Sequence, residues 1–320
     1  MTKKLTRCSL AITGNRTWSR ATCDRAPDLT GPEFLDVNGV RLAVLERRGT
    51  EPPVFFAHAT GLHARTWNQI IARIPGRRAI AFDMRGHGLS AKPEPPYEWH
   101  VFGEDTAALA RVLSLRGATG VGHSMGGHSL ALAAAMMPEA FADLLLIDPV
   151  IMPPALYTGR PREPHFARRR RNQWTSPEEM FERFKDRLPF RTWDPAVLRD
   201  YCDYGLVPAV DGNGYVLACP PEIEASIYEA STLHDANIND RLGEIETSVT
   251  VIRAPRFMPS NEGPMDMTAS LTAPDLATRF RHGQDVVVQH SHFIPMEAPE
   301  LVAEHVNGVG DGERSRGQLT

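Results

Sequence analysis

A serine and a histidine far apart in the chain have the residue types and local sequences that nucleophilic catalysis needs. Ser124 lies in Gly122–Gly126 (GHSMG), after an apolar run that ends at Val121 and before a helix-forming segment that stops at Pro138. A strand, a sharp glycine-bounded turn and a helix would expose the serine at the apex of the turn. The N–H of Met125, at the start of that helix, could then bind an oxyanion.

A serine hydroxyl is a poor nucleophile at neutral pH, so it needs a base beside it. His292 is the preferred candidate, and His290 is its rival. Both histidines follow the apolar segment 285–289, which is typical of a buried strand.

Strands and helices alternate along most of the chain. The predicted strands are residues 33–38, 40–48, 53–57, 78–82, the run ending at 121, 143–147, 248–253 and 285–289, and the predicted helices include 99–115, 129–137 and 298–306. This alternation predicts an α/β fold with a mostly parallel sheet and right-handed crossovers. Ligands bind at the carboxyl ends of such strands, where Ser124 and Asp148 are both expected.

Four ordered motifs resemble those of the α/β-hydrolase superfamily, over about Val37 to Val306. Besides the serine motif they are His58–Gly61 (HATG), Asp83–Ser90 (DMRGHGLS) and Ser291–Pro299 (SHFIPMEAP). The resemblance implies the α/β-hydrolase fold, with a mostly parallel eight-stranded sheet flanked by helices and an inserted helical lid.

The resemblance also assigns roles to several side chains and amides. The N–H groups of Thr60 and Met125 are expected to form the oxyanion hole, although Ala59 replaces the family's usual glycine. His292 matches the family's catalytic histidine because an aromatic residue follows it. His58 and His87 are expected to brace loops rather than to carry protons.

The acid that should orient the histidine is harder to choose. The family usually places it just after the strand equivalent to residues 249–253, but this chain has no carboxylate there until Glu262 and Asp266. Some family members carry the acid after the preceding strand, at the position of Asp148. Asp148 is therefore the first choice, with Asp266 second and Glu262 third.

The domain boundaries follow from composition and from the resemblance. Residues 1–30 and 308–320 are expected to be disordered tails, residues 31–150 and 247–307 the hydrolase core, and residues 151–246 a helical lid inserted in it. For the tail at the start, a start codon assigned too far upstream is the alternative. Within the lid, the run Arg168–Arg171 could recognise an anion, but a solvated helix face paired with Glu178, Glu179 and Glu182 is preferred.

These features predict a cofactor-independent serine hydrolase that cleaves a carboxylic ester or related acyl bond of a small molecule. Cleavage of a C–C bond, acyl transfer, and a catalytically weak ligand-binding protein are the alternatives. A serine at position 124 argues against the dehalogenases and epoxide hydrolases of the family, which use aspartate there.

Composition limits the other classes of function. The chain has 320 residues, 42% of them hydrophobic, and a net charge of −4, so nothing favours binding to nucleic acid or to an anionic membrane. The four cysteines lack C-x-x-C spacing and are expected to be reduced thiols in a cytoplasmic protein. No metal or cofactor is expected, and a homodimer is left open.

Overall fold

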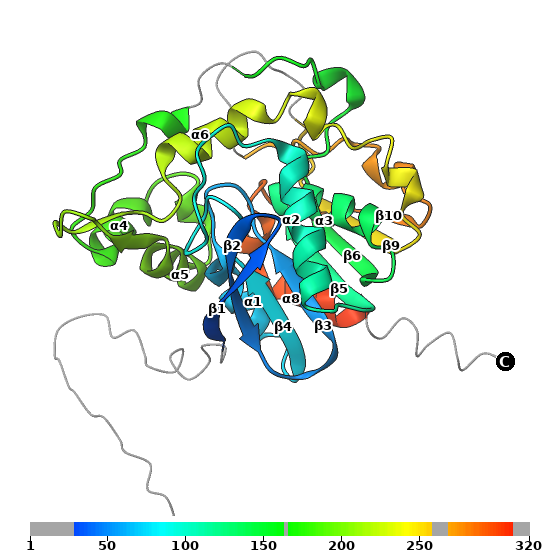
Figure 1. The fold of residues 1–320 in the computed structure, drawn as a ribbon, viewed down its shortest axis with the longest axis horizontal. Coiled ribbons are helices and arrows are strands. Elements are labelled where there is room, and N and C mark those ends of the chain that lie inside the picture. Colours follow the sequence, from blue (N-terminus) through cyan, green and yellow to red (C-terminus); the bar gives the residue numbers. More distant parts are fainter. Residues whose placement is uncertain (1–28, 163–165, 258–267, 310–320) are drawn as a thin grey trace, which may run out of the picture.

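A computed structural model describes residues 29–162, 166–257 and 268–309, and it is organised around one eight-stranded sheet (Figure 1). In spatial order the strands are β1 (Thr30–Val37), β2 (Val40–Arg47), β4 (Arg77–Phe82), β3 (Thr50–Ala57), β5 (Ala118–His123), β6 (Phe141–Ile147), β9 (Ser248–Arg253) and β10 (Gly283–Val287). Only β1 and β2 break the parallel arrangement: β1 pairs antiparallel with β2, and β2 antiparallel with β4. The predicted fold class, including the eight strands, is confirmed.

The sheet begins with a hairpin where the sequence predicts one. Asn38 and Gly39 have φ values of 46° and 72°, which two-residue hairpin turns require. The first strand starts at Thr30, three residues before the predicted start, and Leu29 is buried. The predicted tail of residues 1–30 therefore extends two residues too far, because pairing with β2 includes Thr30. Residues 1–28 lie outside the described part of the chain.

Helices cover both faces of the sheet. On one face lie α2 (Trp99–Val112) and α3 (Met125–Met136), and their apolar side chains share a core with residues such as Phe55 and Leu144. On the other face lie α1 (Asn68–Ala72) and α8 (Pro299–Val309), which share a core with Phe56 and Ile147. The helix α8 passes the predicted tail boundary at residue 308 and ends at Val309.

Residues 151–246 form smaller elements at one end of the sheet (Figure 1). They are the single-turn 3₁₀ helices η3 (Pro154–Leu156), η4 (Phe166–Arg169), η5 (Phe190–Thr192), η6 (His234–Ala236) and η7 (Leu242–Glu244), the helices α4 (Pro177–Phe184), α5 (Pro195–Tyr204) and α6 (Pro221–Ala230), and the hairpin β7 (Leu206–Pro208) and β8 (Tyr215–Leu217). The hairpin was not predicted. We call this segment the cover.

A third apolar cluster joins the cover to the loops of the sheet. Trp174, Trp193 and Tyr201 of the cover are buried in it with Leu62, which follows β3, and Phe293, which follows β10. The cover therefore packs directly on the carboxyl ends of the parallel strands, where the predicted site residues lie.

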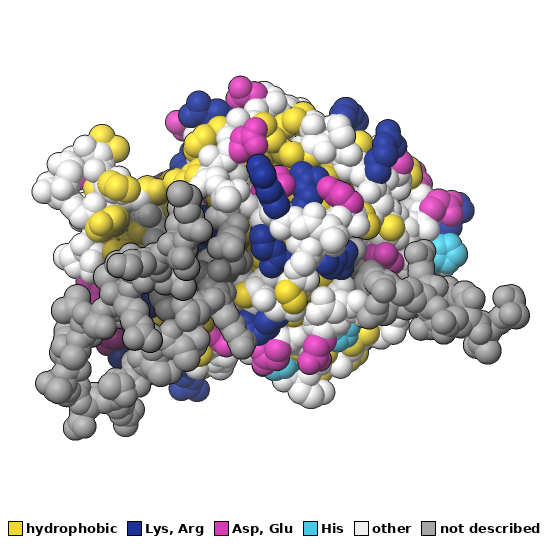
Figure 2. All heavy atoms as spheres, turned by 90° about the horizontal axis from the view of Figure 1, so that it is seen from below, with side chains coloured by type: hydrophobic (Ala, Val, Ile, Leu, Met, Phe, Trp, Pro, Cys, Tyr) yellow, Lys and Arg dark blue, Asp and Glu magenta, His cyan; other side chains and the backbone are white. Residues whose placement is uncertain are grey.

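The molecular surface mixes charges of both signs, in agreement with the small net charge. Figure 2 shows acidic and basic side chains interspersed on the face seen from below. None of the helices in the described segments is both long enough and apolar enough to span a bilayer.

Candidate active site

Ser124 occupies a strained turn between β5 and α3. Its backbone angles are φ 56° and ψ −117°, which a non-glycine residue rarely adopts. Two glycines let the strand and the helix approach each other. A Cβ atom on Gly122 would lie 2.6 Å from the Gly126 carbonyl oxygen, and one on Gly126 would lie 2.1 Å from the Ala57 carbonyl oxygen. The turn therefore needs glycine at both positions.

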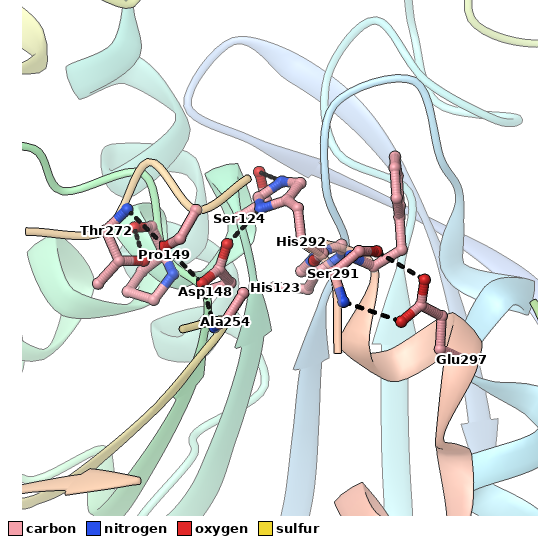
Figure 3. Close-up of polar contacts among 11 residues, drawn as sticks. His123, Ser124, Asp148, Pro149, Ala254, Thr272, Ser291, His292 and Glu297 are labelled. Atoms are coloured by element: carbon pink, nitrogen blue, oxygen red, sulfur yellow. Dashed lines mark hydrogen bonds and ion pairs between the residues drawn. The ribbon is translucent and has the colours of Figure 1, made fainter. Parts of the chain in front are cut away.

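The structure brings Ser124, His292 and Asp148 together (Figure 3). In the sequence, His292 is 168 positions from Ser124 and 144 positions from Asp148. His292 Nε2 is 3.0 Å from Ser124 Oγ, and His292 Nδ1 is 2.5 Å from Asp148 Oδ2. All three residues are buried, and Asp148 has no exposed surface. One imidazole thus contacts a hydroxyl on one side and a carboxylate on the other.

Asp148 follows β6 and turns sharply there, with φ 42°. Its second oxygen, Oδ1, accepts hydrogen bonds from the Ala254 N–H at 3.0 Å and from Ser270 Oγ at 2.7 Å. Burying a carboxylate without hydrogen-bond donors is costly, and these two donors stabilise Asp148 in this position. The family usually carries its acid just after the strand equivalent to β9. Here the residue after β9 is Ala254, and its N–H is a donor to the acid instead. The alternative acids Glu262 and Asp266 lie outside the described residues.

The loop that carries His292 is held by two groups that the sequence did not reveal. His123 Nε2 donates to the His292 carbonyl oxygen at 2.8 Å, since a carbonyl oxygen can only accept. Burial and the neighbouring His292 ring lower the pKa of His123. Glu297 accepts from the Ser291 N–H at 3.0 Å and from Ser291 Oγ at 2.6 Å. The rival base His290 is directed at Glu297 instead, 3.4 Å from Oε2.

The two predicted oxyanion donors belong to the loop after β3 and to the first residue of α3. Thr60 and Met125 touch, with Thr60 Oγ1 3.4 Å from Met125 Sδ. Among the described residues, neither backbone N–H donates to a protein acceptor, and Met125 is the first residue of α3, where helix N–H groups lack partners. Ala59 does not have a positive φ, so the alanine fits this loop without backbone strain.

His58 and His87 brace the loop that bears Thr60, as predicted. His58 Nε2 accepts from the Met84 N–H at 3.0 Å, and its Nδ1 lies 2.8 Å from the Ala59 carbonyl oxygen. His87 Nε2 accepts from the Gly61 N–H at 3.0 Å. Burial lowers the pKa of His58 well below 6.5 and that of His87 to about 4, so both rings are neutral acceptors near pH 7.

A pocket of about 340 Å³ lies between the cover and these loops. Loop residues Thr60, Gly61, Leu62 and Phe293 form its wall near the serine. The remaining wall comes from the cover and consists largely of aromatic and basic side chains: Phe166, Arg170, Arg171, Trp174, Arg183, Phe184, Arg187, Leu188, Pro189, Phe190, Trp193, Tyr201, Glu224 and Tyr228.

The arginine run does not form the solvated, glutamate-paired helix face that the sequence predicted. Arg171 does pair with Glu179, as expected. Arg168 instead pairs with Glu229, and Arg170 pairs with the buried Glu224 and donates to Tyr201 Oη at 2.7 Å. The prediction failed because the run begins in η4, which packs on α6, and α6 supplies the carboxylates for Arg168 and Arg170.

Known proteins match parts of this chain. The 2-(acetamidomethylene)succinate hydrolase of Mesorhizobium japonicum is 35% identical over 130 residues, which are 39% of this chain and 46% of that protein. An esterase of Mycobacterium tuberculosis is 34% identical over 126 residues, 39% of this chain and 41% of that protein. The chain thus spans less than half the length of these two relatives in the matched regions.

Solved structures match over most of the chain. The crystal structure of an E-2-(acetamidomethylene)succinate hydrolase has a TM-score of 0.68 and 23% identity, and the match covers 88% of this chain and 98% of that one. At this identity the similarity concerns the fold.

A sequence model described as the alpha/beta hydrolase family matches residues 54–305. The matched range runs from β3 into α8 and includes the serine turn, Asp148 and His292. The chain belongs to the alpha/beta hydrolase family.

Proposed function

We propose that this protein is a cofactor-independent serine hydrolase that cleaves an ester or related acyl bond of a small molecule. The observation that carries the proposal is the buried row of hydrogen bonds from Ser124 through His292 to Asp148. This row has the order of groups that a nucleophile, a general base and an orienting acid require. Relatives named as a hydrolase and an esterase support the same reaction class.

The chemistry follows from the contacts. His292 Nε2 removes the proton of Ser124 as Oγ attacks the substrate carbonyl carbon, and Asp148 stabilises the imidazolium that forms. The N–H groups of Thr60 and Met125 bind the tetrahedral oxyanion, and such a donor contributes about 3 kcal/mol to lowering a barrier of this kind. His292 then protonates the leaving group, and the acyl-enzyme is hydrolysed by a water that His292 activates.

We further propose that residues 151–246 act as the lid of this site. Their aromatic and basic side chains form most of the pocket wall, so they would exclude water from the reacting groups and select the substrate. The alternative of a catalytically weak binding protein depended on the missing carboxylate after Arg253. Asp148, which follows β6, is a substitute for that carboxylate, because its Oδ2 lies 2.5 Å from His292 Nδ1.

Covalent labelling tests the nucleophile. A fluorophosphonate should label the wild-type protein, and Ser124→Ala should abolish labelling because the attacking oxygen is gone. Ser129→Ala is the matched control, since Ser129 is also buried in α3 but its hydroxyl donates to the Met125 carbonyl oxygen. Unlabelled wild-type protein that is folded by circular dichroism would contradict the proposal.

Hydrolysis of 4-nitrophenyl butyrate tests the acid. Asp148→Asn should lower kcat/KM by roughly 10³- to 10⁴-fold, since the amide cannot stabilise the imidazolium and favours the wrong tautomer. Asp266→Asn and Glu262→Gln should retain the wild-type rate. If either of these two variants lost the activity while Asp148→Asn kept it, the assignment of the acid would be wrong.

A further inference from the structure

The charged side chains that line the pocket are strongly unbalanced. Four arginines and a single carboxylate, Glu224, face it among the described residues. Two of the arginines are already neutralised: Arg170 by Glu224, and Arg171 by Glu179, with its guanidinium also 4.3 Å from the ring centre of Trp174. The remaining charge of the pocket therefore belongs to Arg183 and Arg187.

Arg183 and Arg187 have no carboxylate of their own. Neither makes an ion pair or side-chain hydrogen bond within the described residues, and both are solvent-exposed. The glutamates of α4 are paired elsewhere, Glu178 with Arg199 and Glu182 with Lys185. Arg183 lies in the last turn of α4, and Arg187 follows three residues after the helix ends at Phe184, so both positive charges line the same pocket without a carboxylate partner among the described residues.

Aromatic side chains line the pocket together with these arginines. Phe184 and Phe190 stack with ring centres 4.3 Å apart, and Trp174 meets the edge of Phe184 at 5.4 Å. The same pocket is lined by Thr60, whose Oγ1 is 3.4 Å from Met125 Sδ, and by Phe293, which directly follows His292. A complementary ligand has a reactive acyl group, an apolar body and an anionic end.

We propose that the substrate carries a carboxylate, remote from the bond that is cleaved, which Arg183 and Arg187 bind at the pocket mouth. The planar guanidinium groups of arginine match a carboxylate with two parallel N–H donors, which a lysine cannot do. The inference rests on the proposed hydrolase function and adds the substrate class to it.

Three esters test the inference on the full-length protein. The neutral compound is 4-nitrophenyl butyrate, the mono(4-nitrophenyl) ester of glutaric acid carries a carboxylate on the acyl side, and 4-butyryloxybenzoate carries one on the leaving group. The wild type should prefer one of the two charged esters by kcat/KM over the neutral one, and the preferred ester tells which side of the bond faces the arginines. The double variant Arg183→Gln/Arg187→Gln should lower this selectivity ratio about tenfold, as expected for two partly exposed ion pairs.

Two controls separate charge recognition from general damage. Arg191→Gln removes an exposed arginine of η5 that does not line the pocket and should leave the ratio unchanged. Added salt should lower the wild-type ratio but not that of the double variant, because salt screens exposed charges. If the protein hydrolyses the neutral ester and the selectivity ratio is the same in the wild type and in the double variant, the inference is overturned. The hydrolase proposal would still stand.

A binding measurement makes the inference testable even if no ester is hydrolysed. In Ser124→Ala, monomethyl glutarate should quench the fluorescence of the pocket tryptophans, Trp174 and Trp193, at lower concentration than dimethyl glutarate. Adding Arg183→Gln and Arg187→Gln should remove that difference. Equal binding of the two compounds to Ser124→Ala would contradict carboxylate recognition independently of catalysis.

Discussion

Two residues of the site have unusual backbone conformations, and both lie at strand ends. Ser124 after β5 and Asp148 after β6 have φ values of 56° and 42°, among the few positive φ values at non-glycine residues of the described chain. Such conformations cost on the order of 1–3 kcal/mol each and persist only where surrounding contacts hold them. Hydrogen bonds between the neighbouring strand ends hold them here: Ser124 N–H donates to Ile147, and Asp148 N–H donates to Ile252.

Ser270 is expected to act as a positioning residue for Asp148. Its hydroxyl donates to Asp148 Oδ1 at 2.7 Å and is buried. Ser270→Ala should lower kcat about tenfold and leave KM unchanged, because a hydrogen bond to a charged group contributes about 1.5–3 kcal/mol and the Ala254 N–H remains. Steady-state kinetics on 4-nitrophenyl butyrate provide the measurement.

The control for Ser270 is Ser231→Ala. Ser231 is also buried, but its hydroxyl donates to the Tyr228 carbonyl oxygen at the end of α6, away from the acid. This variant should keep the wild-type kcat. A Ser270→Ala protein with unchanged kcat would show that the Ala254 amide alone is sufficient for Asp148.

At this scale the sequence indicated the candidate catalytic residues, which the structure brings together, but not the groups that hold them. Ser124 and His292 lie in distinctive local motifs, so their contact could be predicted. Ser270 is 122 positions away from Asp148, in a stretch without apolar periodicity, and nothing local indicates its hydrogen bond. His123 precedes the serine, but its contact with the His292 carbonyl oxygen depends on two loops meeting in space.

The close approach of β5 and α3 sets the position of the serine, and it depends on glycine, which has no side chain, at the point of contact. Gly122→Ala should lower the free energy of unfolding by about 2 kcal/mol or more, because the new methyl group would lie 2.6 Å from the Gly126 carbonyl oxygen and must push the helix away. The midpoint of urea unfolding, followed by circular dichroism, measures this loss.

Gly243→Ala is the matched control for that substitution. A Cβ atom on Gly243 would have no atom within 4 Å, and the residue does not have a positive φ. The free energy of unfolding of this variant should match that of the wild type within about 0.5 kcal/mol, so the urea midpoints should be similar. Similar midpoints for Gly122→Ala and Gly243→Ala would mean that the close approach of β5 and α3 adjusts easily.

Elements were predictable where their apolar pattern is long. The strand β9 has the predicted bounds, Ser248–Arg253, because a short run rich in valine and isoleucine between turns is typical of a strand. The hairpin of β7 and β8 was missed because each strand has only three residues. Patterns that short cannot distinguish a strand from a loop.

The whole described molecule is expected to unfold as one unit. The cover shares an apolar cluster with the loops of the sheet, in which Trp174 and Trp193 lie beside Leu62, Phe293 and Met296. Tryptophan fluorescence and far-ultraviolet circular dichroism should therefore give coincident urea transitions.

The origin of the fluorescence change can be checked with Trp174→Phe and Trp193→Phe, which remove the cover's signal and leave Trp67 and Trp99 of the main core. The remaining signal should change at the same urea concentration as that of the wild type. A fluorescence transition that precedes the loss of circular dichroism, and that disappears in these variants, would show that the cover unfolds separately.

At this largest scale, the sequence predicted the sheet and the position of the cover in the chain, but not the pairing of its charges. Side-chain periodicity does not indicate which glutamate an arginine meets. Arg170 and Glu224 are separated by 54 positions and are joined by the packing of η4 on α6.

The contact between Glu224 and Gly61 has a consequence for how this protein can diverge. A Cβ atom on Gly61 would lie 2.8 Å from Glu224 Oε1, so α6 packs directly on the loop that bears Thr60. Substitutions in α6 are therefore expected to disturb the loop that bears Thr60, whereas Arg183 and Arg187 are exposed side chains of the cover. Under the proposed hydrolase function, substitutions at 183 and 187 would change which compounds the pocket accepts and leave Ser124, His292 and Asp148 in place.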